Sequence, residues 1–361
     1  MININNHDRI KGEIVEGKMK AAILYKPYDI RIEEVDIPEI GPNEVLLRIK
    51  AVGICGSDVH FYKTGRCGSF VVKEPLVLGH EASGEVVEVG ENVTNVKKGD
   101  RVAIEPGFPC GFCYYCKSGR YNLCPNVKFY GAPPIHGAFR EYAPAHAAFV
   151  YKLPDNVTFE EGALIEPLAV GMQGVKRCNM EDGAVIAVFG CGPVGLLTLQ
   201  AAKACGAGYA IATDLLDYRL ELAEKVGADV IINVSKEDVV KRVMEITDGR
   251  GADVVFEVSG SERAFKDALR IVRPGGSIVQ IGIFEKEEIS FDPALLIDKE
   301  LTLFGVFRYA NVYEPAIRLV SAGKIKLKPL ITHTFPLDDI GRAFEVIIKK
   351  EGNPVKVIIK P

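Results

Sequence analysis

The glycine-rich segment at 190–195, with the sequence G-C-G-P-V-G, restricts the possible folds more than any other part of the chain. It follows an apolar run at 184–189 and precedes a stretch at 194–205 whose apolar residues recur with helical spacing. An unbroken apolar run is typical of a strand buried on both faces, and G-x-G-x-x-G between strand and helix is typical of dinucleotide-binding sheets. The residues expected to cradle a pyrophosphate at the helix N-terminus are Gly190, Gly192, Pro193, Val194 and Gly195.

The choice of dinucleotide depends on Asp214, which ends the next predicted strand 19 residues after Gly195. A carboxylate at this position can hold the adenosine ribose hydroxyls and would repel a 2′-phosphate, so we expect NAD rather than NADP. Arg219, a few residues further on, keeps NADP open as an alternative. A glycine turn in another α/β fold, with Asp214 as a plain cap, is the other interpretation.

The order of the predicted elements indicates two domains. From about residue 167, strands at 209–213, 230–233, 253–258, 277–281 and 301–306 alternate with helical segments, which predicts a doubly wound parallel sheet. Before that, β-branched runs separated by Gly, Pro and Asn predict a β-rich domain. We place the β-rich domain at 1–166, completed by 306–361 with a returning strand at 355–359, and the dinucleotide-binding domain at 167–305.

Four cysteines, Cys110, Cys113, Cys116 and Cys124, fall in one short segment. Two disulfides or free thiols are the alternatives to a metal site. Cysteines two residues apart pair poorly as disulfides but converge easily on one ion, so we expect a structural zinc ion.

A second set, Cys55, His80, Glu81 and Glu166, offers a thiolate, an imidazole and two carboxylates. These donors suit zinc, and three protein ligands with an open position are typical of a catalytic zinc site. Each residue taken alone also fits a buried thiol or an ordinary surface pair, and spacing does not bring Cys55 near Glu166. On the residues alone, both interpretations stay open.

Charge and composition argue against other classes of partner. The 44 basic and 48 acidic residues give a net charge of −4 without a basic block, so we expect no nucleic-acid partner. No apolar run is long enough for a membrane span, and the polar stretch at 1–20 lacks the apolar core of a secretory signal. We expect 1–18 to be an extension before the first strand. Nine cysteines without such a signal favour thiols and metal ligands, which predicts a cytoplasmic protein.

Several strings resemble the zinc-dependent medium-chain dehydrogenases, and among them the sorbitol and xylitol dehydrogenase branch. They are C-G-S-D-V-H at 55–60, L-G-H-E-A-S-G at 78–84, K-L-P-D-N-V at 152–157, E-G-A-L-I-E-P-L at 161–168 and G-V-F-R-Y at 305–309. The resemblance implies a GroES-like catalytic domain and a Rossmann domain. It also implies that Cys55, His80 and Glu81 bind a catalytic zinc ion, with Glu166 holding a water molecule or exchanging in as a ligand.

The same resemblance assigns substrate and proton-transfer roles. It implies that Arg308 and Tyr309 contact a polyol, and that Ser57 and His60 form a relay to solvent. A surface ion pair for Arg308 and a structural hydrogen bond for His60 are the alternatives. Phe61, Tyr62 and Phe129 are candidate pocket walls, with core packing as the alternative for each.

The expected activity is therefore oxidation of the C2 hydroxyl of sorbitol, xylitol or L-iditol to the ketose, with hydride transfer to NAD. Threonine or 2,3-butanediol is the alternative substrate, and a binding protein without turnover is the alternative class. The resemblance also implies a homotetramer. The four-cysteine segment departs from the mammalian-type sorbitol dehydrogenases and resembles microbial and insect forms.

Overall fold

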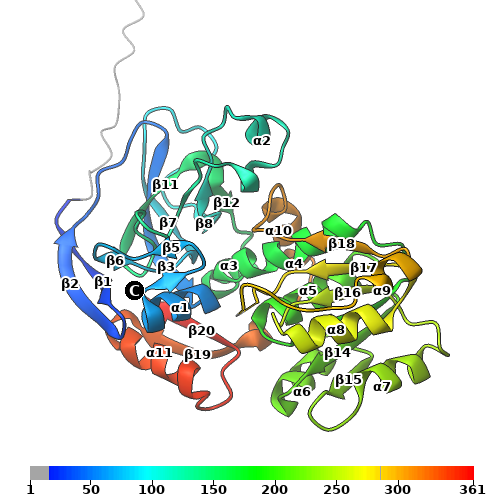
Figure 1. The fold of residues 1–361 in the computed structure, drawn as a ribbon. Coiled ribbons are helices and arrows are strands. Elements are labelled where there is room, and N and C mark those ends of the chain that lie inside the picture. Colours follow the sequence, from blue (N-terminus) through cyan, green and yellow to red (C-terminus); the bar gives the residue numbers. More distant parts are fainter. Residues whose placement is uncertain (1–15, 285) are drawn as a thin grey trace, which may run out of the picture.

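The computed structural model describes residues 16–361 except residue 285, and it has two halves (Figure 1). One half is rich in antiparallel strands and contains both the N-terminal strands and the C-terminal end of the described chain. The other half is a parallel sheet covered by helices. The N-terminal extension expected at 1–18 lies, up to residue 15, outside the described residues.

The β-rich half is built on a seven-stranded sheet with the order β12-β8-β7-β3-β20-β19, in which β11 also pairs with β3. Its strands are β3 (Glu44–Gly53), β7 (Glu81–Val89), β8 (Arg101–Ile104), β11 (Tyr142–His146), β12 (Val150–Lys152), β19 (Ile331–Pro336) and β20 (Lys356–Lys360). Smaller sheets join β1 (Lys18–Lys26), β2 (Asp29–Asp36) and β6 (Leu76–Val77), β4 (Arg66–Cys67) and β5 (Phe70–Val71), and β9 (Gly107–Phe108) and β10 (Lys128–Phe129).

Short helices surround this sheet. The α-helices are α1 (Gly56–Thr64), α2 (Tyr114–Lys117), α3 (Phe159–Ala163) and α11 (Ile340–Lys349), whereas α10 (Tyr313–Ser321) packs on helix α4 (Ile165–Cys178) of the other half. The 3₁₀ turns are η1 (Tyr121–Leu123), η2 (Ala147–Phe149), η3 (Lys328–Leu330) and η4 (Leu337–Asp339). The turn η4 leads directly into α11.

The parallel half has the strand order β15-β14-β13-β16-β17-β18, the order of a doubly wound dinucleotide-binding sheet. Its strands are β13 (Val185–Phe189), β14 (Tyr209–Asp214), β15 (Val230–Asn233), β16 (Ala252–Glu257), β17 (Val272–Gln280) and β18 (Thr302–Gly305). Its helices are α4 (Ile165–Cys178), α5 (Pro193–Ala204), α6 (Asp217–Lys225), α7 (Val239–Ile246), α8 (Glu262–Ile271) and α9 (Ala294–Asp298).

Local chemistry explains where these helices begin. Pro193 occupies the first turn of α5, where its fixed φ suits the helix and its missing N–H costs nothing. The Asp238 side chain accepts from two backbone N–H groups at the start of α7, and the Ser261 hydroxyl accepts from Ala264 at the start of α8.

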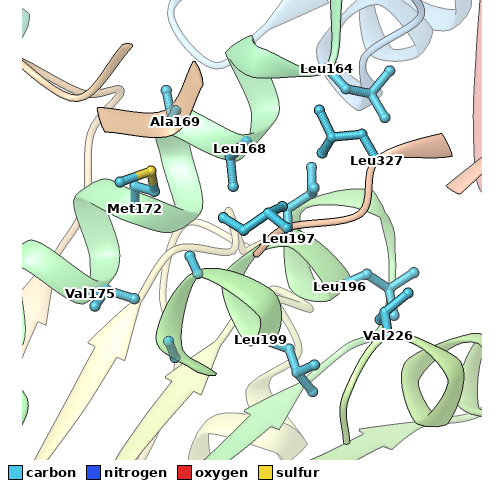
Figure 2. Packing of buried hydrophobic residues seen from close by; sticks show 14 of the residues in the cluster. Leu164, Leu168, Ala169, Met172, Val175, Leu196, Leu197, Leu199, Val226 and Leu327 are labelled. Atoms are coloured by element: carbon cyan, nitrogen blue, oxygen red, sulfur yellow. The ribbon is translucent and has the colours of Figure 1, made fainter. Parts of the chain in front are cut away.

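A buried cluster joins the two halves. Figure 2 shows Leu168 and Met172 of α4 in the same cluster as Leu197 of α5, with Leu327 arriving from the C-terminal part of the chain. The cluster also contains Ala103 from β8 of the other half. Helix α4 follows the β-rich segment directly. This packing therefore fixes the first turn of α4 against both halves.

The final strand returns to the first half as the sequence predicted. Ile358 and Ile359 of β20 pair antiparallel with Gly53 and Val52 of β3. The domain boundaries at 166/167 and 305/306 stay predictions.

Candidate active site

Three of the four expected catalytic metal ligands converge in the structure. Ligand atoms of Cys55, His80 and Glu81 all lie within 4.8 Å of one another. Cys55 immediately precedes α1, and the other two residues lie at the start of β7, so a helix start and a strand start meet here. His80 and Glu81 are buried and Cys55 is half-buried. Thiolate, imidazole and carboxylate together fit a zinc ion with one position left for a substrate oxygen.

Asp58 ties the two ligand-bearing segments together, and the sequence analysis did not single it out. Its carboxylate is fully buried and accepts from the backbone N–H of Cys55 at 2.9 Å and of Gly79 at 3.1 Å. Its Oδ1 also lies 3.7 Å from Nδ1 of His80. A carboxylate beside a ligating imidazole orients the ring, so Asp58 is a supporting residue of the metal site. Its position in the C-G-S-D string was the available signal.

Glu81 is also bound to a buried lysine that the sequence analysis missed. The Nζ of Lys356 donates to both Glu81 oxygens, at 2.8 and 2.6 Å, and to the Ile54 carbonyl at 3.1 Å. Burial alone would lower the pKa of Lys356, but Glu81 reverses this and raises it, so the lysine stays charged. A lysine in the otherwise apolar strand V-K-V-I-I was the signal that could have revealed it.

The Glu81 carboxylate lies so close to the backbone of β3 that only glycine fits at position 53. A Cβ on Gly53 would lie 2.0 Å from Oε2 of Glu81, so a larger residue would displace the carboxylate. The glycine therefore allows β3 to pass beside the metal group.

Glu166 does not join the group of converging ligand atoms. It lies in the first turn of α4, where its Oε1 accepts from the hydroxyl of Tyr309 at 2.6 Å. Burial raises the pKa of Glu166 to about 7. The positive charge of His80 opposes this rise, and the negative charge of Glu81 adds to it. The sequence expected Glu166 as a water-binding residue or an exchanging ligand, and its position beside the group leaves both roles as predictions.

Phe129 links Arg308 to the metal group, because its ring lies next to both Arg308 and His80. The Phe129 ring centroid is 5.4 Å from that of His80, and the Arg308 guanidinium lies 4.2 Å from the Phe129 centroid. Nη1 of Arg308 is buried without a hydrogen-bond partner among the described residues. Burial lowers the pKa of Arg308, which remains a cation at physiological pH. An unpartnered buried donor is costly, and a ligand oxygen would satisfy it.

Helix α1 also carries the expected relay residues Ser57 and His60 and the candidate pocket walls Phe61 and Tyr62. Ser57 is half-buried and His60 is exposed, and no hydrogen bond joins their side chains within the described part of the chain. The Tyr62 ring stacks on Phe344 with a centroid distance of 4.4 Å, in the core of the β-rich half that also contains Phe61. The geometry therefore favours core packing for Tyr62 and Phe61, the alternative that the sequence left open.

The glycine turn has the shape that a pyrophosphate needs. A Cβ on Gly195 would lie 1.8 Å from the Gly190 carbonyl oxygen, and Gly190 has a φ of +96°. In contrast, a Cβ on Gly192 would meet only the Nη1 of Arg219, at 4.0 Å. Gly190 and Gly195 are thus required by backbone conformation and close packing, and the open space beside Gly192 at the start of α5 fits the phosphates of a dinucleotide.

Asp214 and Arg219 lie beside this turn. The Asp214 carboxylate accepts from the backbone N–H of Cys191 at 2.7 Å and of Leu216 at 3.0 Å. Nη1 of Arg219 lies 3.7 Å from Asp214, and its Nε is buried without a hydrogen-bond partner in the described residues. Asp214 therefore holds the backbone of the glycine turn at Cys191. Arg219 has an unpartnered N–H donor, among the described residues, next to the open space beside Gly192.

The four cysteines of the 110–124 segment also converge. Their sulfur atoms lie within 4.8 Å of one another, with Cys113 and Cys116 3.4 Å apart. All nine cysteines of the chain are free thiols. Four convergent sulfurs fit a closed tetrahedral zinc site.

Comparison with known proteins agrees with this geometry. Residues 41–155 match the alcohol dehydrogenase GroES-like domain, and residues 193–322 match the zinc-binding dehydrogenase model. The chain is 43% identical to sorbitol dehydrogenase of Bacillus subtilis, over 96% of this chain and 98% of that protein. It is 45% identical to D-xylulose reductase of Saccharomyces cerevisiae, over 94% and 97% of the two chains.

A solved structure extends the comparison to the fold. The crystal structure of 2R,3R-butanediol dehydrogenase from Bacillus subtilis matches with a TM-score of 0.88 and 38% identity, covering 95% of this chain and 99% of that one. A GroES-like domain that contains a Cys-His-Glu group, joined to a doubly wound dinucleotide sheet, defines a metal-dependent oxidoreductase. The chain belongs to the zinc-binding alcohol dehydrogenase family. Within the described residues, no helix is both long and apolar enough to cross a membrane.

Proposed function

We propose that this protein is an NAD-linked, zinc-dependent polyol dehydrogenase that oxidises the C2 hydroxyl of sorbitol, xylitol or L-iditol to the corresponding ketose. The similarity to sorbitol dehydrogenase and D-xylulose reductase along nearly the whole chain supports this substrate class. The likeness to 2R,3R-butanediol dehydrogenase supports a small vicinal diol as the second candidate.

The observation that carries the proposal is the buried, unpartnered Nη1 of Arg308 above Phe129, next to His80. A polyol has hydroxyl groups along its whole length, and one of them can accept from this donor while another lies at the metal group. A site with such a donor discriminates strongly against a substrate that cannot satisfy it. 2,3-Butanediol has methyl groups where a polyol has further hydroxyl-bearing carbons, so it offers no outer hydroxyl to this donor.

The chain's own residues account for binding and proton transfer. A zinc ion held by Cys55, His80 and Glu81 would supply the Lewis acid that favours loss of the hydroxyl proton, and bound nicotinamide would accept the hydride. Glu166, with its pKa near 7, is suited to hold or release a proton at neutral pH, and Tyr309 fixes its orientation.

The relay to solvent remains part of the proposal. Ser57 is half-buried and His60 is exposed on the same helix, so the histidine lies where it can exchange protons with water. An imidazole can both accept and donate a proton, which that step requires.

The test is the effect of Arg308→Ala on two substrates. We expect kcat/KM to fall by roughly 100-fold for sorbitol, because a charged hydrogen bond to substrate is lost, and by less than about fivefold for 2,3-butanediol. Equal losses on both substrates would refute the polyol assignment of Arg308. Faster wild-type turnover of the diol than of every polyol would favour the second candidate.

Assembly as a homotetramer and a cytoplasmic location are also proposals. Leu303 on the edge strand β18 is exposed, as are Phe112 and Tyr114 on the four-cysteine segment, and such surfaces suit contacts between copies. Light scattering coupled to gel filtration tests the tetramer, and a monomeric mass would contradict it.

A further inference from the structure

The loop that carries Arg308 and Tyr309 has an unusual backbone. Arg308 and Asn311 have φ angles of +53° and +57°, in the left-handed region that residues other than glycine rarely occupy. Such a conformation persists only where the surroundings hold it in place. The contacts that hold residues 307–311 therefore determine the positions of Arg308 and Tyr309.

Several of those contacts come from the four-cysteine lobe, defined here as residues 107–129, while Lys176 and Gln173 of α4 hydrogen-bond the backbone of Ala310. The hydroxyl of Tyr121 accepts from the backbone N–H of Asn311 at 2.8 Å, and the Asn311 side chain donates to the Gly119 carbonyl at 2.9 Å. The Asn122 side chain donates to the Phe307 carbonyl, also at 2.8 Å. Hydrogen bonds from the lobe thus bind both ends of the loop.

The lobe and the loop are separated elsewhere by a cavity of about 540 Å³. Gly119 and Asn122 line it on the side of the lobe, and Phe307 and Ala310 line it on the side of the loop. Because this space is not filled by side chains, close packing there does not fix the loop. The hydrogen bonds at its rim carry more of the connection.

Tyr121 is itself anchored on a buried carboxylate. Its hydroxyl donates to Glu105 at 2.8 Å, and Tyr151 donates to the other oxygen of Glu105 at 2.8 Å. Glu105 lies in the fully buried interior directly after β8 of the main sheet. The Tyr121 hydroxyl therefore lies between Glu105 and Asn311.

We propose that Tyr121 is a positioning residue for the substrate loop. The chain of contacts runs from the sheet through Glu105 and Tyr121 to Asn311. It sets where Arg308 meets the substrate and where Tyr309 meets Glu166. The four-cysteine lobe then supports substrate recognition in addition to folding, a role that rests on the proposed polyol function.

The test compares Tyr121→Phe with Tyr151→Phe. Both variants remove one phenol hydroxyl from Glu105 and keep the ring, but only Tyr121→Phe removes the partner of the Asn311 N–H. We expect Tyr121→Phe to raise KM for sorbitol roughly tenfold, with KM for NAD⁺ unchanged and kcat within about threefold. Tyr151→Phe should keep the wild-type KM. Equal KM values for the two variants would overturn the proposal, because the effect would then come from Glu105 alone.

A double variant identifies the residue through which Tyr121 acts. In an Arg308→Ala background, Tyr121→Phe should add less than about twofold to KM, since the side chain that it positions is already gone. A full tenfold increase in that background would overturn the proposal. Asn122→Asp, which keeps the size and removes the donor to Phe307, should raise KM in the same direction.

Hydrogen exchange on the substrate-free protein separates this inference from the proposed function. Tyr121→Phe should exchange amides of 306–312 at least about tenfold faster than wild type and Tyr151→Phe. If neither wild type nor variants oxidise polyols, the proposed function fails, and faster exchange would still establish the loop support. Unchanged exchange would refute that support whatever the substrate is.

Discussion

The Glu81 carboxylate can be neutralised by Lys356 or by a bound zinc ion. Replacing Lys356 by methionine removes the first partner and leaves only the second. In the described structure the lysine ammonium lies 2.6 Å from Glu81, and both side chains are almost fully buried. Methionine has a similar length and volume but no charge. The substitution leaves a buried carboxylate that only a metal ion can then neutralise.

The magnitude follows from this burial. Removing one partner of a buried ion pair costs about 3–5 kcal/mol, because the other charge remains without compensation. This cost applies in full to the metal-free protein. If a zinc ion at Cys55, His80 and Glu81 replaces the ammonium, most of that cost disappears from the loaded form. The difference appears as tighter zinc binding by roughly 100-fold or more.

The assay is a competitive chelator titration at pH 8, together with calorimetric melting of the chelated and loaded proteins. Lys356→Met should melt well below wild type when chelated and close to wild type when loaded. The control is Lys349→Met, which removes an exposed pair with Glu345 at 3.0 Å and should change neither quantity measurably. Equal melting losses in both forms, or weaker zinc binding by Lys356→Met, would show that zinc does not replace the ammonium as the partner of Glu81. Lys356 would then hold Glu81 in place for the metal.

Three further predictions concern other parts of the structure. Burial raises the pKa of Glu105 to about 7, so the folded chain binds more protons than the unfolded chain between about pH 4.5 and 7, and stability falls as pH rises through that window. In urea titrations, the loss of stability across this window should be smaller in Glu105→Gln than in wild type by about 3 kcal/mol. Asp214→Ser should lower the ratio of kcat/KM for NAD⁺ to that for NADP⁺ by about tenfold or more, measured by initial rates, since the carboxylate no longer repels a 2′-phosphate. Cys116→Ser should reduce bound zinc from about two ions per chain to one and lower the melting temperature, measured by metal analysis and calorimetry, while a retained second zinc would contradict the four-sulfur site.

Local patterns were enough to predict the fold and much of the site. The apolar run before Gly190 and the alternating elements after it predicted the parallel sheet, because buried strands and helices have different periods. The cysteine spacing predicted the convergent group at 110–124, since short loops restrict where the thiols can lie. Cys55, His80 and Glu81 could be brought together only by the family resemblance.

The residues that the sequence did not reveal act across long separations. Lys356 reaches Glu81 because β20 pairs with β3, and nothing near Lys356 in the sequence indicates that pairing. Tyr121 reaches Asn311 across 190 positions, and no local pattern in the sequence indicates that contact. Tyr62 was harder to assign, because an aromatic residue near a ligand motif fits a pocket wall and a core equally well.

Initial rates of NAD⁺ reduction on sorbitol, xylitol, L-iditol, threonine and 2,3-butanediol, measured before and after removal of zinc, test the proposed polyol dehydrogenase activity. We expect turnover of at least one polyol above the other two substrates, loss of that turnover with chelator and its return with zinc. Turnover only on threonine or the diol would contradict the polyol site. Rates that are unaffected by complete zinc removal would contradict the catalytic metal group, and no turnover by the zinc-loaded protein would favour a binding protein.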